Sequence, residues 1–327
     1  MRTISFLLFC FILGCVSAQT RTEFFRNVRI DHRQHQFVAR NKIDAEIAVK
    51  TNAYRVIFDE QNRITDIFYE ERGRWAVGRN RISHVHIVYT DSVEKRFYNF
   101  PEEYQDKEEH NIRLVKLILN DDKVPVEIRN YCIDGKLTKD RQGVFAYRRI
   151  LNEDGWMIES YFLDENGLRT TNNNGDYSRR YRWSQDDTHY RVELAFHDRA
   201  GRLHDGERGH SLVRMRFEKG RGGNMTEIQF RNTRRQRVLN ERGFAMGRWT
   251  FENGLLKTAN YFGTDGRRIN RIFERFFRAE FEYNEFGNPI RTVFSRLHPN
   301  GGVVRAERTF IYDENQNLMY HNDRWMR

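Results

Sequence analysis

The sequence contains little cysteine and little proline, and these two shortages limit the class of protein. Its cysteines are Cys10, Cys15 and Cys132. Removal of an N-terminal leader would leave Cys132 alone, which excludes an internal disulfide. Only four prolines occur in 327 residues, as expected for a chain whose backbone N–H groups are needed in β-ladders. An exported animal protein of this size would usually be disulfide-linked, so we favour a protein of the bacterial cell envelope.

Long apolar runs are also scarce, and the clearest lies in the first eighteen residues, MRTISFLLFCFILGCVSA. This segment has Arg2 near its start, an apolar run over 4–13 and small residues at its end, which is the pattern of a secretory signal peptide. We therefore expect residues 1–18 to be removed and the protein to be exported, to the periplasm or beyond the cell. Two alternatives stay open: a buried N-terminal strand or helix, or lipidation of Cys15 in the sequence ILGC, which would give an outer-membrane lipoprotein with a lipid anchor. No other segment reaches the length of about eighteen apolar residues that a transmembrane helix needs.

Acidic residues are outnumbered, because 56 Lys and Arg stand against 46 Asp and Glu, for a net charge of +10. Basic and acidic residues are interleaved along most of the chain, and the densest basic block is RNTRRQR at 231–237. An exported protein seldom meets nucleic acid, so we expect no nucleic-acid partner. Anionic envelope polymers such as lipopolysaccharide, teichoic acid or peptidoglycan would be attracted instead. The alternative is that the surplus Arg residues lie on a solvated surface and bind no partner.

What the sequence has in abundance is one type of turn. A strand-like segment that ends in an Asp, Asn or Gly turn recurs about every thirty-two residues, at positions 61, 92, 123, 155, 187, 223, 254, 287 and 316. In most units a second turn follows, at Gly73, Gly135, Gly167, Gly201, Gly266 and Gly301. A third turn opens several units, at Gly143, Gly175, Gly209 and Gly243. Asp and Asn bond their own backbone in turns and Gly adopts positive φ freely, so we interpret these acidic residues as turn formers.

The segments between the turns predict an all-β fold. They are rich in aromatic and β-branched residues, and RVELAFHD and MTEIQFRN alternate charged with apolar positions, as half-buried strands do. A single hairpin is marginal in water, but stacked hairpins bury one continuous face. We predict antiparallel hairpin repeats of about thirty-two residues that form an elongated, twisted array, with a short-bladed β-propeller as the alternative.

The repeats also suggest a domain organisation. We expect a signal peptide at 1–18, an N-terminal cap at 19–54, the hairpin repeat domain at 55–320 and a C-terminal tail at 321–327. Two segments have helical character: residues 100–119 could form one helix, and residues 268–283 could form a strand or a short helix. Unpaired strands at the ends of an open array would favour end-to-end self-association.

An aromatic residue stands just before several turns, as in YFLDENG, FEYNEFGN and FIYDENQN. In this respect the chain resembles the YD/RHS-type and MORN-variant hairpin repeats of exported bacterial proteins. Trp183, Phe217 and Phe251 stand where the YD pattern has Tyr. The resemblance implies an extended β-array used for display or binding, usually without chemistry in the repeats themselves.

Motifs for chemistry are missing. His84 and His86 share one face of a probable strand, a spacing that can bind metal. No nearby Cys and no carboxylate in phase beyond Asp91 completes a site, so we expect surface histidines and no metal. The sequence has no GxSxG motif, Cys132 has no recognisable catalytic partner, and the Gly-rich stretch EKGRGGN lacks the Lys-Ser/Thr of a phosphate loop. We therefore predict neither catalysis nor a cofactor, with a polysaccharide-active protein that uses two carboxylates as the alternative.

The remaining function class is binding. The aromatic residues recur in phase with the turns, at Tyr161-Phe162, Phe196, Phe230, Tyr261-Phe262 and Phe294. We interpret them as a stacked core ladder, with a strip of exposed rings for sugar or peptide binding as the alternative. We predict a non-enzymatic structural or interaction module of the envelope that binds a protein or an anionic polysaccharide. The residues that we expect to carry binding are Arg231, Arg234, Arg235, Arg237, Trp183 and Trp249.

Overall fold

A computed structural model describes residues 20–31, 35–76, 82–100, 112–206, 208–220, 223–273 and 275–326. The expected signal peptide and Cys15 lie outside these residues. The chain forms twenty-two strands and one short helix in the described part. Their bounds are β1 Arg21–Ile30, β2 Phe37–Ile43, α1 Ala45–Ala48, β3 Asn52–Phe58, β4 Ile64–Glu71, β5 Arg74–Trp75, β6 His84–Tyr89, β7 Val93–Asn99, β8 Leu114–Leu119, β9 Pro125–Tyr131, β10 Ala146–Leu151, β11 Met157–Leu163, β12 Arg169–Thr170, β13 Ser178–Gln185, β14 His189–His197, β15 Leu212–Glu218, β16 Met225–Arg231, β17 Met246–Glu252, β18 Leu255–Phe262, β19 Arg278–Tyr283, β20 Pro289–Leu297, β21 Val303–Tyr312 and β22 Leu318–Met326.

All strands belong to one antiparallel sheet in which neighbours in sequence are mostly neighbours in space. β2 pairs with β1 and β1 with β3, and from there the order follows the chain to β22 at the far edge. The two-residue strands β5 and β12 pair only with the ends of β4 and β11, respectively. The sheet is open, so the predicted hairpin array is confirmed and the propeller alternative is not formed.

The turns form as predicted, and each of the nine first-turn positions falls between two paired strands. The backbone N–H of Gly155 (φ 75°) donates to the carbonyl of Asn152 at 3.0 Å. The Asn152 side chain accepts from the backbone N–H of Trp156 at 2.8 Å, and Asp164 accepts from Leu168 at 2.9 Å. These side chains are therefore turn formers. One feature was not predicted: the register shifts by one residue beside the turn in seven of the hairpins, a bulge that increases local twist.

The phase-locked aromatic residues form the core, as expected. Phe162, Phe196, Phe230 and Tyr261 are all less than one-tenth exposed. Rings that follow the third turns alternate with rings from the strands. The series of neighbouring rings is His210, Phe230, Phe244, Tyr261, Phe276 and Phe294, with successive centroids 4.9 to 5.9 Å apart. A second core lies under the N-terminal strands and includes Phe25, Val56, Ile67, Val85 and Ile87.

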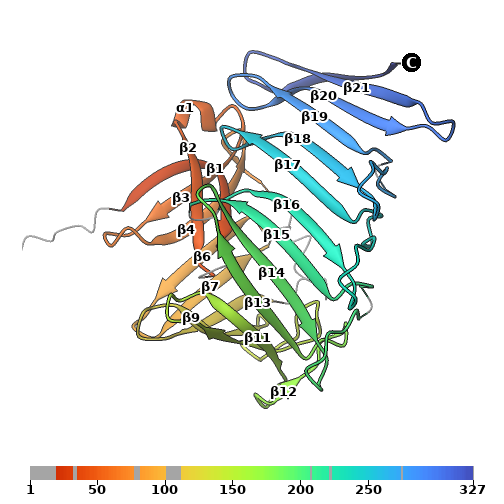
Figure 1. The fold of residues 1–327 in the computed structure, drawn as a ribbon. Helices are drawn as coiled ribbons and strands as arrows, with labels where there is room; N and C mark the ends of the chain where they lie inside the picture. Colours follow the sequence, from red (N-terminus) through yellow and green to blue (C-terminus); the bar gives the residue numbers. More distant parts are fainter. Residues whose placement is uncertain are drawn as a thin grey trace, which may run out of the picture.

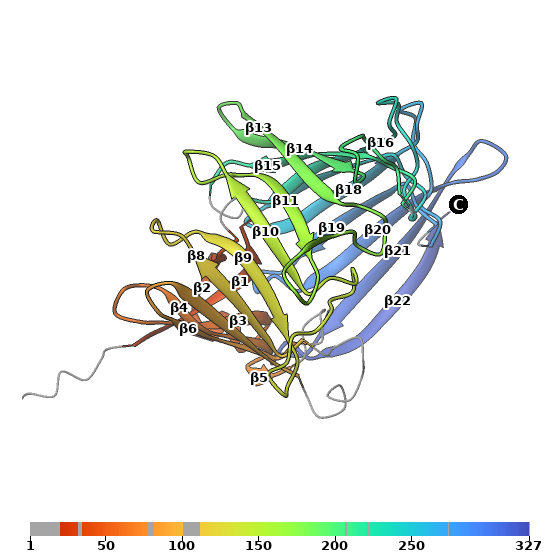
Figure 2. The same ribbon diagram turned by 90° about the horizontal axis from the view of Figure 1, so that it is seen from below.

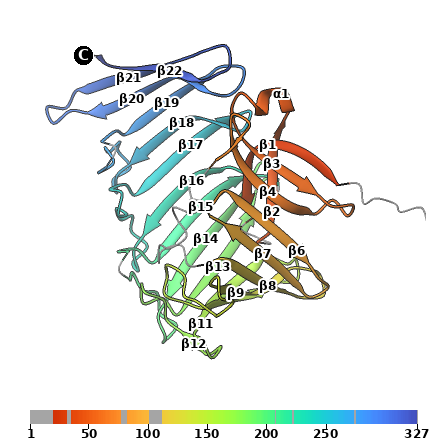
Figure 3. The ribbon, with the colours of Figure 1, turned by 180° about the vertical axis from the view of Figure 1, so that it is seen from behind.

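The sheet is curled rather than flat. Figures 1 and 3 show β13 to β22 following one another across a curved wall, with the N-terminal strands beside it, and Figure 2 shows the curl from below. The first strand reaches the turns of distant hairpins. Arg26 donates to the carbonyl of Phe286 at 2.9 Å, and Asn27 donates to that of Gly254 at 3.4 Å. Residues more than 220 positions apart in sequence are thereby brought together.

The two helical alternatives are not formed in the described residues. Leu114–Leu119, the end of the first candidate, is strand β8, and residues 101–111 lie outside the described part. In the second candidate, 272–273 is a turn and Arg278–Tyr283 is strand β19. Strand pairing on both sides of β19 satisfies its backbone groups, and this overrides the helix-like spacing of its apolar residues.

Candidate functional site

The outer face of the array, opposite the aromatic core, carries interleaved Arg and Glu side chains. Strand alternation places them there, and many form ion pairs between adjacent strands. Arg248 lies 2.7 Å from Glu227, and Arg291 lies 2.7 Å from Glu282 and 3.0 Å from Glu307. Exposed pairs of this kind contribute little stability, typically about 0.2–1 kcal/mol. Much of the positive charge of the Arg residues on this face is thus offset by neighbouring Glu residues.

The basic block at 231–237 differs from the rest of this face. It forms the second turn of its unit directly after β16, and Arg231 and Arg237 are bridge partners across that turn. Arg231 donates to the carbonyl of Arg235 at 2.7 Å, and Arg234 lies at the exposed tip. The structure therefore brings together all four arginines that the sequence singled out.

A fifth guanidinium, that of Arg214 on β15, completes what we call the arginine cluster: Arg214, Arg231, Arg234, Arg235 and Arg237. Burial first, and then the charges of Arg214 and Arg237, lower the pKa of Arg231, while Glu193 opposes this effect. Glu193 pairs with Arg214 at 2.6 Å and with Arg235 at 3.6 Å. Asp205 is a second nearby carboxylate, and it accepts from the backbone N–H of Thr233 at 3.0 Å. With five guanidinium groups gathered at this turn, cations outnumber these two carboxylates, and the resulting positive potential suits an anion.

The two predicted tryptophans point to the inside and do not join the arginine cluster. Trp249 belongs to the aromatic core, with its ring 6.3 Å from that of Tyr261. It packs so closely on Gly247 that a Cβ there would lie 2.7 Å from the indole. The glycine at this position thus makes room for the indole.

Trp183 lines a cavity of about 600 Å³ between the inner face of β13–β16 and the N-terminal strands. Its indole N–H donates to the carbonyl of Met157 at 2.7 Å, which fixes the ring. The aromatic lining of the cavity consists of Phe37, Tyr54, Tyr69, Tyr98, Trp183, Tyr190 and Phe217, and its charged groups are Arg29, Asp31 and Glu218. This cavity could hold a small ligand with apolar faces.

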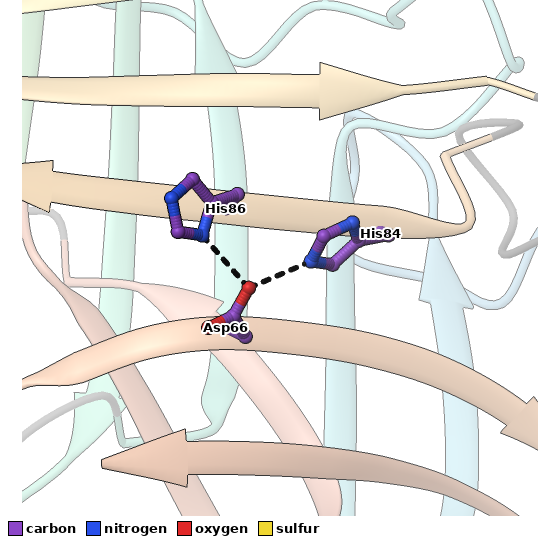
Figure 4. Close-up of side chains that lie close together, drawn as sticks. All are labelled: Asp66, His84 and His86. Atoms are coloured by element: carbon purple, nitrogen blue, oxygen red, sulfur yellow. Dashed lines mark hydrogen bonds and ion pairs between the residues drawn. The ribbon is translucent and has the colours of Figure 1, made fainter. Parts of the chain in front are cut away.

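His84 and His86 lie together on the outer side of β6, as predicted, but a carboxylate accompanies them. Oδ1 of Asp66, on the adjacent strand β4, lies 2.9 Å from Nε2 of His84 and 2.9 Å from Nδ1 of His86 (Figure 4). The two strands pair with Asp66 opposite His86. The chain between β4 and β6 contains the short strand β5, so the sequence spacing did not reveal this partner.

No protein-family model and no curated protein matches the sequence. Among solved structures the chain is similar to the TcdB2-TccC3-Cdc42 crystal structure, at 10% identity and TM-score 0.30, over 91% of this chain and 18% of that chain. It is also similar to the Photorhabdus luminescens Tc holotoxin pore, at 11% identity and TM-score 0.29, over 86% of this chain and 12% of that chain. A eukaryotic initiation factor matches at 8% identity and TM-score 0.21, over 94% of this chain and 88% of that one.

The chain thus spans less than a fifth of either toxin-complex chain. At these TM-scores the likenesses assign neither family nor activity. In the part of the chain that the structure describes, no helix is both long and apolar enough to cross a membrane.

Proposed function

We propose that this protein is an exported, non-enzymatic interaction module of the bacterial envelope that binds an acidic partner, a protein surface or an anionic polymer, through the arginine cluster. The observation that carries the proposal is the local charge imbalance, with five guanidinium groups beside Glu193 and Asp205. Export rests on the pattern of residues 1–18, and the absence of catalytic motifs in the sequence favours binding over chemistry.

The position of the cluster supports this role. It lies at a turn on the outer face, where a large partner can approach without entering the curled sheet. The turn backbone is held by its own hydrogen bonds, because Asn232 Oδ1 accepts from the N–H groups of Arg234 and Gln236 at 3.0 and 2.9 Å. The arginine side chains are thus presented from a fixed backbone, which lowers the entropy lost on binding.

The experiment measures binding of three acidic probes: purified lipopolysaccharide, teichoic acid and poly-L-glutamate. We compare the mature wild-type chain with a variant in which Arg231, Arg234, Arg235 and Arg237 are all changed to Ala. A control variant changes four exposed cations in other parts of the molecule, Arg74, Lys136, Arg141 and Arg305, to Ala and so has the same net charge as the cluster variant.

We expect the cluster variant to bind the preferred probe at least about tenfold more weakly, a difference of about 1.4 kcal/mol. The control variant should bind nearly as wild type does. Equal weakening in both variants would show that only net charge matters, and unchanged binding in the cluster variant would refute the site.

A second candidate function is suggested by the aromatic cavity around Trp183. Sugar rings stack on aromatic faces while polar groups bond their hydroxyls, and the cavity offers both kinds of group. In this case the protein would bind a polysaccharide end or a short oligosaccharide inside the curl. Titration of oligosaccharides against the intrinsic fluorescence of wild type and Trp183→Phe tests this alternative. Saturable quenching that is lost in the variant supports the alternative, and no saturable response removes it.

A further inference from the structure

Three side chains on the outer face of the N-terminal strands have their polar atoms gathered at one point. Asp66 Oδ1 lies 2.9 Å from both imidazole nitrogens, and all three candidate ligand atoms lie within 4.8 Å of one another (Figure 4). Alternation along β6 explains the placement, because Val85 and Ile87 are buried in the core while the histidines face the other way.

The surroundings hold the two imidazoles in place. His84 stacks on Phe68 with ring centroids 4.2 Å apart and an interplanar angle of 5°. Its second nitrogen, Nδ1, lies 2.8 Å from the side-chain amide of Asn99. His86 lies beside Phe97, with centroids 6.1 Å apart. An imidazole fixed by a ring on its face and a hydrogen bond on its other nitrogen is oriented as metal-bound histidines commonly are.

From this geometry we propose that Asp66, His84 and His86 bind a divalent transition-metal ion of the zinc class. Two imidazole nitrogens and one carboxylate are a donor set that suits such ions and disfavours Ca²⁺ and Mg²⁺, which prefer oxygen ligands. Ligand atoms about 2.0–2.1 Å from one ion, at angles between octahedral and tetrahedral, lie about 2.9–3.4 Å apart. The two N···O separations of 2.9 Å already lie in this range, and the third separation, between the two imidazole nitrogens, is within 4.8 Å and has to shorten where it exceeds the range.

The protonation pattern also permits binding. A neutral His84 can have its proton on Nδ1. The side-chain amide of Asn99, rotated so that its oxygen and nitrogen exchange places, then accepts a hydrogen bond from this N–H group. The lone pair of His84 Nε2 is then available to bind a metal ion. The positive charge of the neighbouring Arg55, whose guanidinium lies 4.0 Å from the Phe68 ring centroid, is offset by Glu70 at 2.6 Å.

The site is open on one side. The His86 side chain is 45% exposed, whereas those of His84 and Asp66 are 15% and 18% exposed. An ion bound to three protein ligands on this face would keep one or more positions for water or for an outside ligand, as in three-ligand zinc sites. Such a position could take a carboxylate or imidazole from a partner molecule.

The test is a metal titration of the mature, untagged chain. Zn²⁺ binding is measured by competition with a chromogenic chelator, and Co²⁺ binding is followed by its visible absorption. Wild type is expected to bind one ion per chain, with no competition from millimolar Ca²⁺ or Mg²⁺. Failure of wild type to bind Zn²⁺ or Co²⁺ stoichiometrically would overturn the proposal.

Variants locate the ion. Asp66→Asn and His86→Gln remove one ligand each, and His298→Gln changes a histidine on an exposed turn as the control. Asn99→Ala removes only the orienting partner and should weaken binding by about 10–100-fold. We expect each ligand variant to lose at least as much affinity and the control to lose none. Circular dichroism shows whether each variant is folded, and full metal affinity in a folded ligand variant would refute the site. If one of Asp66→Asn and His86→Gln does not fold, the other is sufficient for the test.

Discussion

The hydroxyl of Thr51 donates a 2.9 Å hydrogen bond to the side-chain carbonyl of Asn288, 237 residues further along the chain. The amide of the same Asn288 donates to the backbone carbonyl of Lys50 at 2.8 Å. Both side chains are buried, at 3% and 7% exposure. The start of β3 is thus tied to the turn between β19 and β20. Side-chain bonds of this kind stabilise the curl, because no strand pairing joins these two parts of the sheet within the residues that the structure describes.

Replacing Asn288 with Ala should destabilise the protein. The change leaves the Thr51 hydroxyl and the Lys50 carbonyl without this partner in a buried place, and each lost partner costs about 1–3 kcal/mol. We expect the urea unfolding midpoint to fall by an amount equivalent to about 2–4 kcal/mol. Asn300→Ala, at an exposed turn tip, is the control and should change stability by less than about 0.5 kcal/mol. Equal midpoints for the two variants would contradict a structural role for the Asn288 contact.

The aromatic core predicts a large difference between two phenylalanines. Phe230 is 8% exposed and makes edge-to-face contacts with His210 and Phe244, whereas Phe273 is 73% exposed. Phe230→Ala removes a ring from the middle of the ladder and should cost about 3–5 kcal/mol. Phe273→Ala should have little effect. Chemical denaturation of both variants measures the difference, and a small loss for Phe230→Ala would show that the ladder is not the core of the array.

His210 should make the protein less stable at mildly acidic pH. Burial, more than any other cause, lowers the pKa of His210, and burial followed by the charge of Arg180 lowers that of His197. In the unfolded chain these histidines therefore become protonated as the pH falls below about 6.5, whereas in the folded chain they stay neutral to a lower pH. Stability is unaffected at high pH and is lost as pH falls below about 6.5, with a slope of at most about 1.4 kcal/mol per pH unit for each histidine.

The control for this pH effect is His210→Phe. Phenylalanine already occupies the equivalent position in the next unit, at Phe244, so the ladder should accept the ring. Melting temperatures at pH 7.5 and 5.5 should differ less in the variant than in wild type. An unchanged difference would show that other groups cause the acid sensitivity.

Arg235 allows the fold and the proposed function to be separated. Its backbone has a φ of 63°, in the left-handed region where the equivalent turns have Gly201 and Gly266. This conformation costs a non-glycine residue about 1–2 kcal/mol, part of which glycine returns as extra freedom in the unfolded chain. Arg235→Gly should therefore stabilise the protein by about 0.5–1 kcal/mol while weakening binding of an acidic probe. A loss of stability together with unchanged binding would contradict both assignments.

How much the sequence could predict depended on the range of the interactions. Asn152 and Asp164 bond their own turns, so local sequence identifies them, and the period of the turns led directly to the hairpin array. The inward placement of Trp183 depends on strand alternation counted from the correct register, and the cavity that it lines needs the N-terminal strands as the opposite wall. The contact of Thr51 with Asn288 depends on how much the sheet curls, which no single repeat encodes.

The candidate sites show the same difference between local interactions, which the sequence reveals, and long-range interactions, which need the structure. Four members of the arginine cluster lie within residues 231–237 and were recognised from the sequence, whereas Arg214 joins them through the pairing of β15 with β16. His84 and His86 were recognised as a pair on one face. Asp66 lies in the preceding hairpin, and only the register of β4 on β6 brings it opposite His86.

The salt dependence of binding tests the central claim, which is that the arginine cluster binds an acidic partner, most directly. Affinity for the preferred acidic probe is measured between about 50 and 300 mM salt for wild type, the cluster variant and the control variant of equal net charge. Charges in direct contact with the probe release counterions on binding and set the slope of log affinity against log salt. We predict a shallower slope and weaker binding for the cluster variant alone. Identical slopes in all three proteins would contradict the account.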